Sequence, residues 1–488
     1  MTSATPPEPT PAASARPGSA QAGAPTLRRQ VLSLAIPASL ESVFQMSFGF
    51  VDQVVIGRLG EVALAAVGLT NQMVFLVTLV LGAVAATTAI LVAQAHGRGD
   101  ADSVSAATGA SFLVGAAVAV PIALVPLLAP AGVLRLLGAE AEVVALGAPF
   151  IQLVALTLPM ALLGTIAVSV LRSLGDAKTP MVVTFGAVGT NTVLNLILVF
   201  GLGPIPALGV LGAAYATVAT HLLRLGVLVY CMVVRQPHAR FELADFVRVR
   251  LALVGKIARL TSPIALTEIF WALGAFLYTL LVVRLGTTAL AANQVVLTTE
   301  AIFIMCSSGL SVAALTLIGQ SIGAGDLQQL RERSRYIVKL GVASAVLFGL
   351  LLALATWTIE LLYPKLGGEA LRWAVWGLLI MAVFQPSKVL NMILGNGVLR
   401  AGADNRFVLG ADLVSIYVLG LPLAFGLAIG LDWGLLGVFV GKVVEETARA
   451  ATFLLRLRTS RWHRMVAGDG APGPPPSNPD VLPEPTAP

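Results

Sequence analysis

Charged residues are scarce in this chain. Only 11% of its 488 residues are Asp, Glu, Lys or Arg, whereas an average soluble domain carries about a quarter. Hydrophobic residues make up 57%, and the mean hydropathy is +0.88. So few charges cannot cover a water-facing surface, which excludes a soluble globular protein and indicates that lipid surrounds most of the chain. The net charge of +6 comes from loops between apolar segments, so no nucleic-acid partner is expected.

Cysteine is nearly absent, and the motifs of enzyme active sites are missing. Cys231 and Cys306 lie in apolar stretches without metal-ligand spacing and are expected to be free thiols. The sequence has no Walker loop, GxGxxG, HExxH or GxSxG motif and no Cys/His cluster. We therefore expect no enzyme, no cofactor and no protein-bound metal.

Apolar runs of about 20 residues, the length that crosses a bilayer as a helix, recur along the chain. They lack the alternating pattern of membrane β-strands, so they predict an all-α integral membrane protein. The two ends, 1–27 and the Pro-rich 465–488, are expected to be disordered tails. We count about twelve spans, near 32–57, 62–93, 106–130, 145–170, 181–203, 208–234, 256–283, 288–320, 335–362, 370–397, 407–429 and 434–456.

Lys and Arg residues concentrate in alternate loops. One side receives most of them, including Arg172, Arg400 and the long basic segment 235–255, which we interpret as a cytoplasmic linker. By the positive-inside rule, both termini are expected to face the cytoplasm. We expect a multi-pass protein of the plasma (inner) membrane. The other side carries little beyond Arg58, Arg135, Arg284, Lys365 and Arg372.

The chain contains an internal repeat that holds one register over sixty residues. Pro37, Gln94 and Gly97 recur 226 residues later, with no gap between the pairs. Arg172 and Arg224 recur with shifts of 228 and 225 residues. The repeated pairs include Pro37/Pro263, Leu59/Leu285, Gly60/Gly286, Gln94/Gln320, Gly97/Gly323, Asp100/Asp326, Arg172/Arg400, Asp176/Asp404, Gly212/Gly437 and Arg224/Arg449.

This repeat predicts two six-helix lobes, 28–234 and 256–464. Each half has an even number of spans, so the halves are parallel and related by an axis along the membrane normal. Such lobes rock against each other around a central cleft, which is typical of secondary transporters. The repeat is broken at two polar positions: Tyr278 occupies the position equivalent to Asp52, and Lys442 occupies the position equivalent to Thr217. The break predicts that ion coupling resides in the N-terminal lobe.

Polar residues inside the apolar spans are functional candidates, because a charge in the bilayer core is costly. In the first span, Glu41, Gln45 and Asp52 lie on one helix face. Asp52 is about six residues from the outer loop and is compatible with proton exchange or cation binding. A structural hydrogen bond to a neighbouring helix is the alternative. Glu41 and Gln45 are candidates for lining the cavity.

The fifth and sixth spans add further polar groups. Asn191 and Asn195 are one helical turn apart, and with Thr217 and Asp52 they are compatible with a small oxygen-rich cation site. Hydrogen bonding between helices is the bland alternative. His221 and Arg224 are expected to be interfacial anchors near the cytoplasmic end.

The second half carries its own intramembrane charges. A Glu268–Lys388 pair is compatible with the sequence, as a structural pair or as part of coupling, and Asn391 accompanies Lys388 in the tenth span. Lys442 and Glu446, one turn apart, can pair locally. Acidic residues outnumber basic ones inside the spans, which suits a cationic substrate. The acids are Glu41, Asp52, Glu268, Glu300, Glu445 and Glu446, and the bases are Lys388 and Lys442.

These repeated and polar residues resemble the multidrug and toxic compound extrusion (MATE) family. No single motif is decisive, but their order, spacing and duplication are specific, and the resemblance covers about residues 30–460. The matching stretches include Val51-Asp52-Gln53, Gly57-Arg58-Leu59-Gly60, Gln94-Ala95-His96-Gly97-Arg98-Gly99-Asp100, Leu171-Arg172-Ser173-Leu174-Gly175-Asp176, Ala291-Ala292-Asn293-Gln294 and Leu399-Arg400-Ala401-Gly402-Ala403-Asp404.

The resemblance implies a twelve-helix fold that exports cationic, amphipathic compounds in exchange for H⁺ or Na⁺. Asp52 matches the acidic residue of the first helix that the family uses in coupling, and Gln45 matches a polar position lining the N-terminal lobe. The residues that fall on a cation site of one branch are Asn191, Asn195, Ala213 and Thr217.

The chain departs from two branches of that family. One branch has an aspartate where Asn195 stands, so a Na⁺ site at Asp52, Asn191 and Asn195 has lost a charge. A sodium-coupled branch uses a glutamate deeper in the seventh helix and an aspartate in the tenth. Here Glu268 comes about one turn early, and the tenth helix offers Lys388. H⁺ coupling through Asp52 is the favoured interpretation, with Na⁺ left open.

The sequence leaves two other classes of function open. A flippase for lipid-linked precursors, from the same superfamily, would favour a strongly cationic cavity. A membrane enzyme or a channel is disfavoured by the missing catalytic cluster and by the duplicated architecture. We expect a monomer in contact with membrane lipid whose partners are small cationic or amphipathic molecules.

Overall fold

The structure is a computed structural model, and it describes residues 26–202, 204–235, 251–364 and 366–459. The predicted tail 465–488 lies outside the described residues, as does the tail 1–27 except for residues 26 and 27. Of the predicted linker 235–255, residue 235 and residues 251–255 are described, and they are helical. Side chains of four α1 residues (47, 48, 50 and 51) are not described either.

Helices account for nearly all of the described residues. The only β feature among them is an isolated antiparallel bridge between Leu202 and Ile205. The helices of the first half are α1 (Leu27–Gly57), α2 (Glu61–Gly97), α3 (Ala101–Leu128), α4 (Pro130–Leu136), α5 (Ala141–Ala155), α6 (Thr157–Ser173), α7 (Lys178–Phe200) and α8 (Val210–Arg235).

The second half repeats this arrangement, with π-helical segments continuing two of its helices. Its elements are α9 (Leu251–Arg284), α10 (Thr287–Gly323), α11 (Leu327–Ala355), η3 (Thr356–Thr358), α12 (Ile359–Leu362), α13 (Gly368–Asn391), η4 (Met392–Leu399), α14 (Asn405–Leu413), η5 (Val414–Gly420), α15 (Leu421–Phe425), η6 (Gly426–Gly430) and α16 (Leu435–Arg458).

Each of the predicted spans coincides with a helix or with helices in direct succession. Ten of these are long and apolar enough to cross a membrane. The other two, α1 and α16, are less apolar, but with 31 and 24 residues they are long enough. At 1.5 Å per residue they measure about 46 and about 36 Å, against about 30 Å for a bilayer core. The predicted all-α membrane fold is confirmed.

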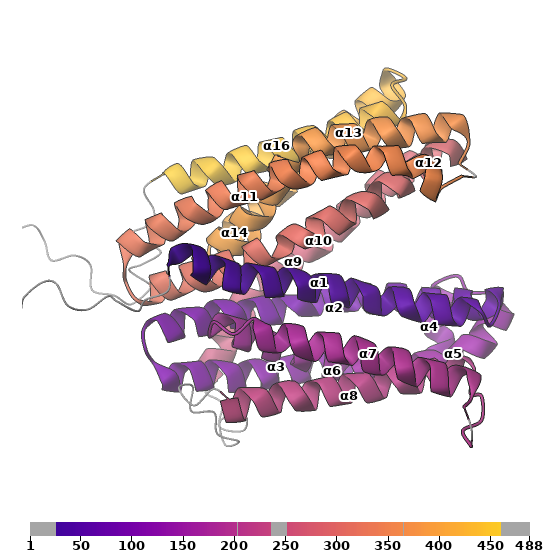
Figure 1. The fold of residues 1–488 in the computed structure, drawn as a ribbon, viewed down its shortest axis with the longest axis horizontal. Helices are drawn as coiled ribbons and strands as arrows, with labels where there is room; N and C mark the ends of the chain where they lie inside the picture. The colour runs from indigo at the N-terminus through magenta and orange to yellow at the C-terminus, as the bar shows by residue number, and fades with distance from the viewer. Residues whose placement is uncertain (1–25, 203, 236–250, 365, 460–488) are drawn as a thin grey trace, which may run out of the picture.

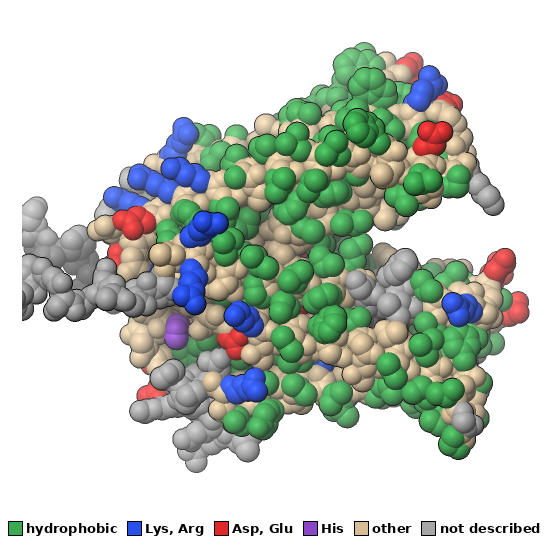
Figure 2. All heavy atoms as spheres, viewed as in Figure 1, with side chains coloured by type: hydrophobic (Ala, Val, Ile, Leu, Met, Phe, Trp, Pro, Cys, Tyr) green, Lys and Arg blue, Asp and Glu red, His purple; other side chains and the backbone are tan. Residues whose placement is uncertain are grey.

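Helices α1–α8 and α9–α16 form two lobes (Figure 1). The lobes lie close together at the end where the chain termini emerge and diverge toward the opposite end. The space-filling view shows the resulting cleft, and it shows Lys and Arg side chains gathered at the closed end (Figure 2).

The first helix of each half crosses to the other lobe at this closed end. Val31, Leu34 and Ala35 of α1 are buried in a hydrophobic cluster with α10, α11 and α13. Reciprocally, Ile257 of α9 is buried in a cluster with α2, α3, α6 and α8. The two lobes are therefore held together by apolar packing of exchanged helix ends.

Repeat-related residues also form a reciprocal contact between the lobes. Gln94 Nε2 donates to the carbonyl of Ala401 at 2.8 Å, and Gln320 Nε2 donates to the carbonyl of Ser173 at 2.9 Å. We call these four residues, together with Gly97 and Gly323, the clasp. A Cβ atom at Gly97 would overlap the backbone carbonyl of Gln320, and one at Gly323 would overlap that of Gln94. Only glycine permits this crossing of α2 and α10.

The turns that follow the clasp explain other repeated residues. Asp100 caps α3 by accepting a hydrogen bond from the Ser103 N–H at 2.9 Å, and Asp326 caps α11 in the same way from Gln329 at 2.8 Å. The hydroxyl and N–H of Ser103 hold the pKa of Asp100 below its usual range. The repeat thus marks positions that shape the scaffold.

We predict that Gly97→Ala forces the clasp ends of α2 and α10 apart. Overpacking of this kind costs about 1–3 kcal/mol when neighbouring backbone must move. Spin labels on Arg98→Cys and Ala324→Cys, both exposed, should report a longer distance in the Gly97→Ala background.

Gly82→Ala is the matched control, because it lies in the same helix and a Cβ there meets nothing within 4 Å. Both free cysteines, Cys231 and Cys306, would be replaced first. An unchanged distance in Gly97→Ala would show that the clasp does not limit the approach of the two helices.

Candidate functional site

Asp52 of α1 lies against α7 near the open end of the N-terminal lobe. It is 9% exposed, and its Oδ1 accepts a hydrogen bond from Asn195 Nδ2 at 2.6 Å. The same Nδ2 donates to Asn191 Oδ1 at 2.9 Å. The structure therefore brings together three of the residues predicted for ion coupling.

This small cluster keeps unused hydrogen-bonding capacity. Among the described residues, Asn191 Nδ2 and Asn195 Oδ1 are buried without a hydrogen-bond partner. No Lys, Arg or His nitrogen of the described chain lies within 4.0 Å of the Asp52 carboxylate. A buried acid without a basic partner is costly in its charged form, so it favours a proton or a cation as its partner.

The remaining predicted residues of this lobe do not join the cluster. The Thr217 hydroxyl donates to the Ala213 carbonyl of its own helix at 2.9 Å. Ala213 packs with Val55 and Val199 in an apolar cluster. Gln45 is exposed on α1. The oxygen-rich site is therefore smaller than predicted.

Glu41 is a paired residue and not part of a cavity wall. It is fully buried, and its carboxylate contacts Arg172 at 2.7 Å and Arg224 at 3.6 Å. Thr184 of α7 donates to it at 3.2 Å. The cavity-lining role predicted for Glu41 was wrong, because two arginines enclose it. Arg224 was also wrongly interpreted as an interfacial anchor, since it points inward to this network.

A cavity of about 630 Å³ occupies the C-terminal lobe. Its size falls within the range of about 300–1,000 Å³ that is common for small-molecule sites. Trp271, Met305 and Met392 contribute apolar surface. The ionisable lining residues are Glu268, Glu300, Lys388, Arg400, Asp412, Lys442, Glu445, Glu446 and Arg449.

Ion pairs in this cavity differ from those predicted. Arg400 binds Glu268 at 3.0 Å, and Lys388 binds Glu300 at 2.5 Å. The sequence left a Glu268–Lys388 pair open, and the structure pairs each of these residues with a different partner. Arg400 had been assigned to a cytoplasmic loop, but it is 7% exposed and its long side chain reaches inward from the end of η4.

Arg449 of α16 is the centre of a second network. Its guanidinium contacts Asp412 at 3.1 Å, Glu445 at 2.5 Å and Glu446 at 3.6 Å. Asn391 donates to the Glu446 carboxylate at 2.7 Å. The local Lys442–Glu446 pair that the sequence allows does not form, because Glu446 contacts Asn391 and Arg449 instead.

Sequence reasoning missed Arg400, Asp412, Arg449 and Tyr278 as lining residues. Three of them could have been found from the repeat. Arg172 and Arg224 recur as Arg400 and Arg449, and Tyr278 occupies the repeat position of Asp52. With Arg400, Arg449 and Asp412 included, the cavity has five acids and four bases, so its acidic excess is smaller than the count from sequence suggested.

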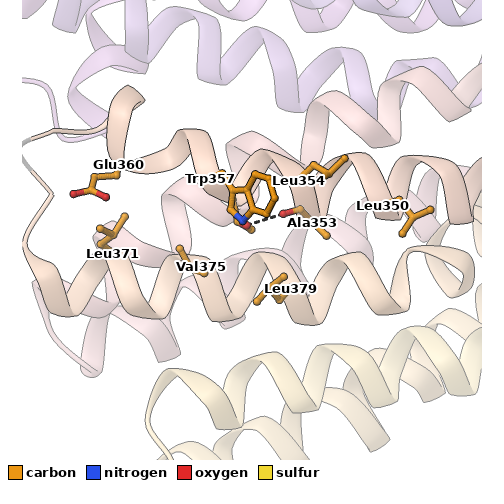
Figure 3. Close-up of a pocket in the computed structure, with 9 residues that line it drawn as sticks. Leu350, Ala353, Leu354, Trp357, Glu360, Leu371, Val375 and Leu379 are labelled. Atoms are coloured by element: carbon orange, nitrogen blue, oxygen red, sulfur yellow. Dashed lines mark hydrogen bonds between the residues drawn. The ribbon is translucent and has the colours of Figure 1, made fainter.

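A second hollow, of about 810 Å³, lies on the outer surface between α11, η3 and α13. Its lining is apolar apart from Thr356 and Glu360 (Figure 3). Trp357, at its centre, is 83% exposed. The polar groups that fix a ligand do not converge in this groove, so the candidate site is the cavity of the C-terminal lobe together with the Asp52 cluster.

Three comparisons relate this chain to known proteins. The sequence profile of the family described as MatE matches residues 37–197 and 263–425, one match in each half. The chain is 32% identical over 475 residues to a probable multidrug resistance protein NorM of Burkholderia pseudomallei, which covers 92% of this chain and 96% of that protein. It is 26% identical over 460 residues to a protein of the same description from Thermotoga maritima, covering 91% and 94%.

Solved structures share the fold. A MATE protein in the bent conformation has a TM-score of 0.82 at 21% identity, covering 91% of this chain and 97% of that one. An outward-facing multidrug resistance MATE transporter has a TM-score of 0.80 at 20% identity, covering 88% and 96%.

The Glu41 network yields a stability prediction. Glu41→Gln leaves two half-buried arginines without a carboxylate, and breaking a fully buried pair in this way costs about 3–5 kcal/mol. Thermal unfolding in detergent should show a large loss of stability for Glu41→Gln. Glu61 is an exposed acid of α2, and Glu61→Gln should change the stability little. The double variant Glu41→Gln/Arg172→Gln should lose less than the sum of the two single variants; an additive loss would show that the pair is not coupled.

Proposed function

Because this chain belongs to the MatE family of multidrug efflux transporters, we propose that it exports cationic, amphipathic compounds in exchange for H⁺ that binds at Asp52. The single observation that carries the choice of ion site is the isolation of Asp52. Each other acid named in the two lobe interiors has a basic partner within 4.0 Å, and Asp52 has none among the described residues.

The contacts of Asp52 favour H⁺ over Na⁺. A sodium site needs several oxygen ligands around the ion, but the group that hydrogen-bonds to the carboxylate is an amide nitrogen, Asn195 Nδ2. A proton requires no such shell. Protonation of Asp52 removes the charge that accepts this hydrogen bond, and so it changes the contact between α1 and α7.

The two-lobe architecture supports alternating access. If the termini face the cytoplasm, as the distribution of Lys and Arg favours, the cleft in Figure 2 opens outward and the clasp closes the cytoplasmic side. Export requires the clasp to open so that substrate enters from the cytoplasm. α1 links the two events, because it carries Asp52 and its first turns pack against the C-terminal lobe.

A flippase for lipid-linked precursors is not favoured. Such a ligand is strongly anionic, whereas the cavity of the C-terminal lobe has one more acid than base. The chain would act as a monomer surrounded by lipid, on small molecules, without a cofactor.

Transport by purified protein in liposomes tests this proposal. With an imposed proton gradient, wild type should move ethidium, and an imposed Na⁺ gradient alone should not drive it. Asp52→Asn should lose proton-driven transport, because an amide side chain cannot bind and release a proton near neutral pH. Asp102 is an exposed acid of α3, and Asp102→Asn should keep proton-driven transport.

If ethidium moves with neither the proton gradient nor the Na⁺ gradient, antiport is contradicted. Full proton-driven transport by Asp52→Asn would leave antiport standing and remove Asp52 as the coupling site. Transport driven by the Na⁺ gradient alone would show that the coupling ion is Na⁺ and not H⁺.

A further inference from the structure

One face of α11 carries three exposed basic residues at the closed end of the molecule, where Lys and Arg side chains gather (Figure 2). Arg331, Arg335 and Lys339 follow one another at intervals of four residues, so they form a stripe along the helix. We call these three residues the basic stripe. Within the described chain, none of them has a carboxylate oxygen within 4.0 Å. Glu332, the acid beside them, accepts a hydrogen bond from Gln328 at 3.0 Å, so the stripe keeps an excess of positive charge.

The same face of α11 is apolar beyond Lys339. Val342 and Val346 are exposed on it, and Trp357, in the η3 turn that continues the helix, is exposed at its far end. Lys339 and Trp357 are about 27 Å apart at 1.5 Å per residue, which is close to the thickness of a bilayer core. Lys and Trp are both typical of membrane interfaces. This length places Lys339 at one edge of the hydrocarbon layer, and Arg335, about 6 Å further along the helix, among the lipid headgroups.

The equivalent helix of the N-terminal lobe has no such stripe. α3 corresponds to α11 through the shift of 226 residues, and both helices begin at the closed end (Figure 1). The positions equivalent to Arg331, Arg335 and Lys339 are occupied by Ser105, Gly109 and Leu113. Because the two helices cross the membrane in the same direction, the positive-inside rule applies equally to both. Orientation alone therefore does not explain the basic stripe, which points to a role specific to α11.

We propose that an anionic phospholipid binds to this face of α11, with its phosphate on Arg335 and Lys339. Its acyl chain lies along Val342 and Val346, on the hydrocarbon side of the two cations. A guanidinium and an ammonium one turn apart can both donate charge-assisted hydrogen bonds to one phosphate group, and Arg331 adds positive charge nearer the water. A lipid fits this surface better than a free phosphate ion, because the cations are followed directly by exposed apolar residues. The site lies on the outside of the C-terminal lobe and depends neither on the transported compound nor on the coupling ion.

Native mass spectrometry of the purified full-length protein in detergent tests this proposal, because it resolves bound lipids one by one. The probes are dioleoyl-phosphatidylglycerol and dioleoyl-phosphatidylcholine, which have the same acyl chains and differ in net charge. Wild type should bind the first phosphatidylglycerol more tightly than the first phosphatidylcholine. Arg335→Gln/Lys339→Gln should weaken phosphatidylglycerol by about thirty-fold, as expected when two cations are lost at an anionic lipid, and should change phosphatidylcholine little.

Arg28→Gln/Arg29→Gln is the matched control. It also removes two exposed cations at the closed end, but adjacent residues of a helix point to different sides and do not share one ligand. This variant should bind phosphatidylglycerol as wild type does. Arg335→Lys/Lys339→Arg keeps both charges and should also keep the preference for phosphatidylglycerol. Inorganic phosphate, added at constant ionic strength, should not displace the lipid, because it has no acyl chain.

Equal affinity of wild type for the two lipids would overturn the inference, whatever the variants do. Unchanged binding of phosphatidylglycerol in Arg335→Gln/Lys339→Gln would show that the basic stripe is not the site. An equal loss in Arg28→Gln/Arg29→Gln would show that the overall surface charge attracts the lipid and that α11 has no specific role. Displacement by inorganic phosphate would show a site that recognises the phosphate alone, without the apolar face.

Discussion

The cost of leaving a charge unpaired in lipid organises the interior of this protein. On insertion scales one such charge costs about 2.5–3.5 kcal/mol, so acids and bases of neighbouring helices find each other. Glu41 holds Arg172 and Arg224 in one lobe, and Arg449 holds three carboxylates in the other. These networks tie helices within a lobe into a rigid body. Asp52 has no basic partner among the described residues, which is why we propose it as the site where an external proton binds.

The two lobes meet at the clasp, where small residues allow close helix contact. At the clasp, Gly97 and Gly323 let the backbones of α2 and α10 touch, and two glutamine side chains bridge the lobes. The bridges are few and polar, so they can be broken at moderate cost. The exchanged ends of α1 and α9 hold the lobes together by contacts separate from the clasp. In the proposed mechanism, α1 connects protonation of Asp52 with opening of the clasp.

Much of the fold could be predicted from the sequence, because apolar runs and the internal repeat can be read directly from the order of the residues. The spans followed from run length, and the positions of Gln94 and Gly97 in the clasp coincide with an exact repeat. The partners of buried charges could not be predicted in the same way. Whether Glu268 meets Lys388 or Arg400 depends on how two helices rotate about their axes and on how far an arginine reaches. Arg400 looks like a loop residue by sequence position, yet its guanidinium is buried.

Alternating access requires the two ends of the cleft to open in turn about the clasp. Paired spin labels at the clasp end (Arg98→Cys and Ala324→Cys) and at the open end (Glu61→Cys and Thr287→Cys) test this requirement, since all four positions are exposed and each pair is repeat-related. Distances would be measured in reconstituted protein as the pH is lowered and as substrate is added. We expect the clasp-end distance to lengthen whenever the open-end distance shortens. Two distances that rise and fall together, or a clasp-end distance that never changes, would contradict alternating access about the clasp.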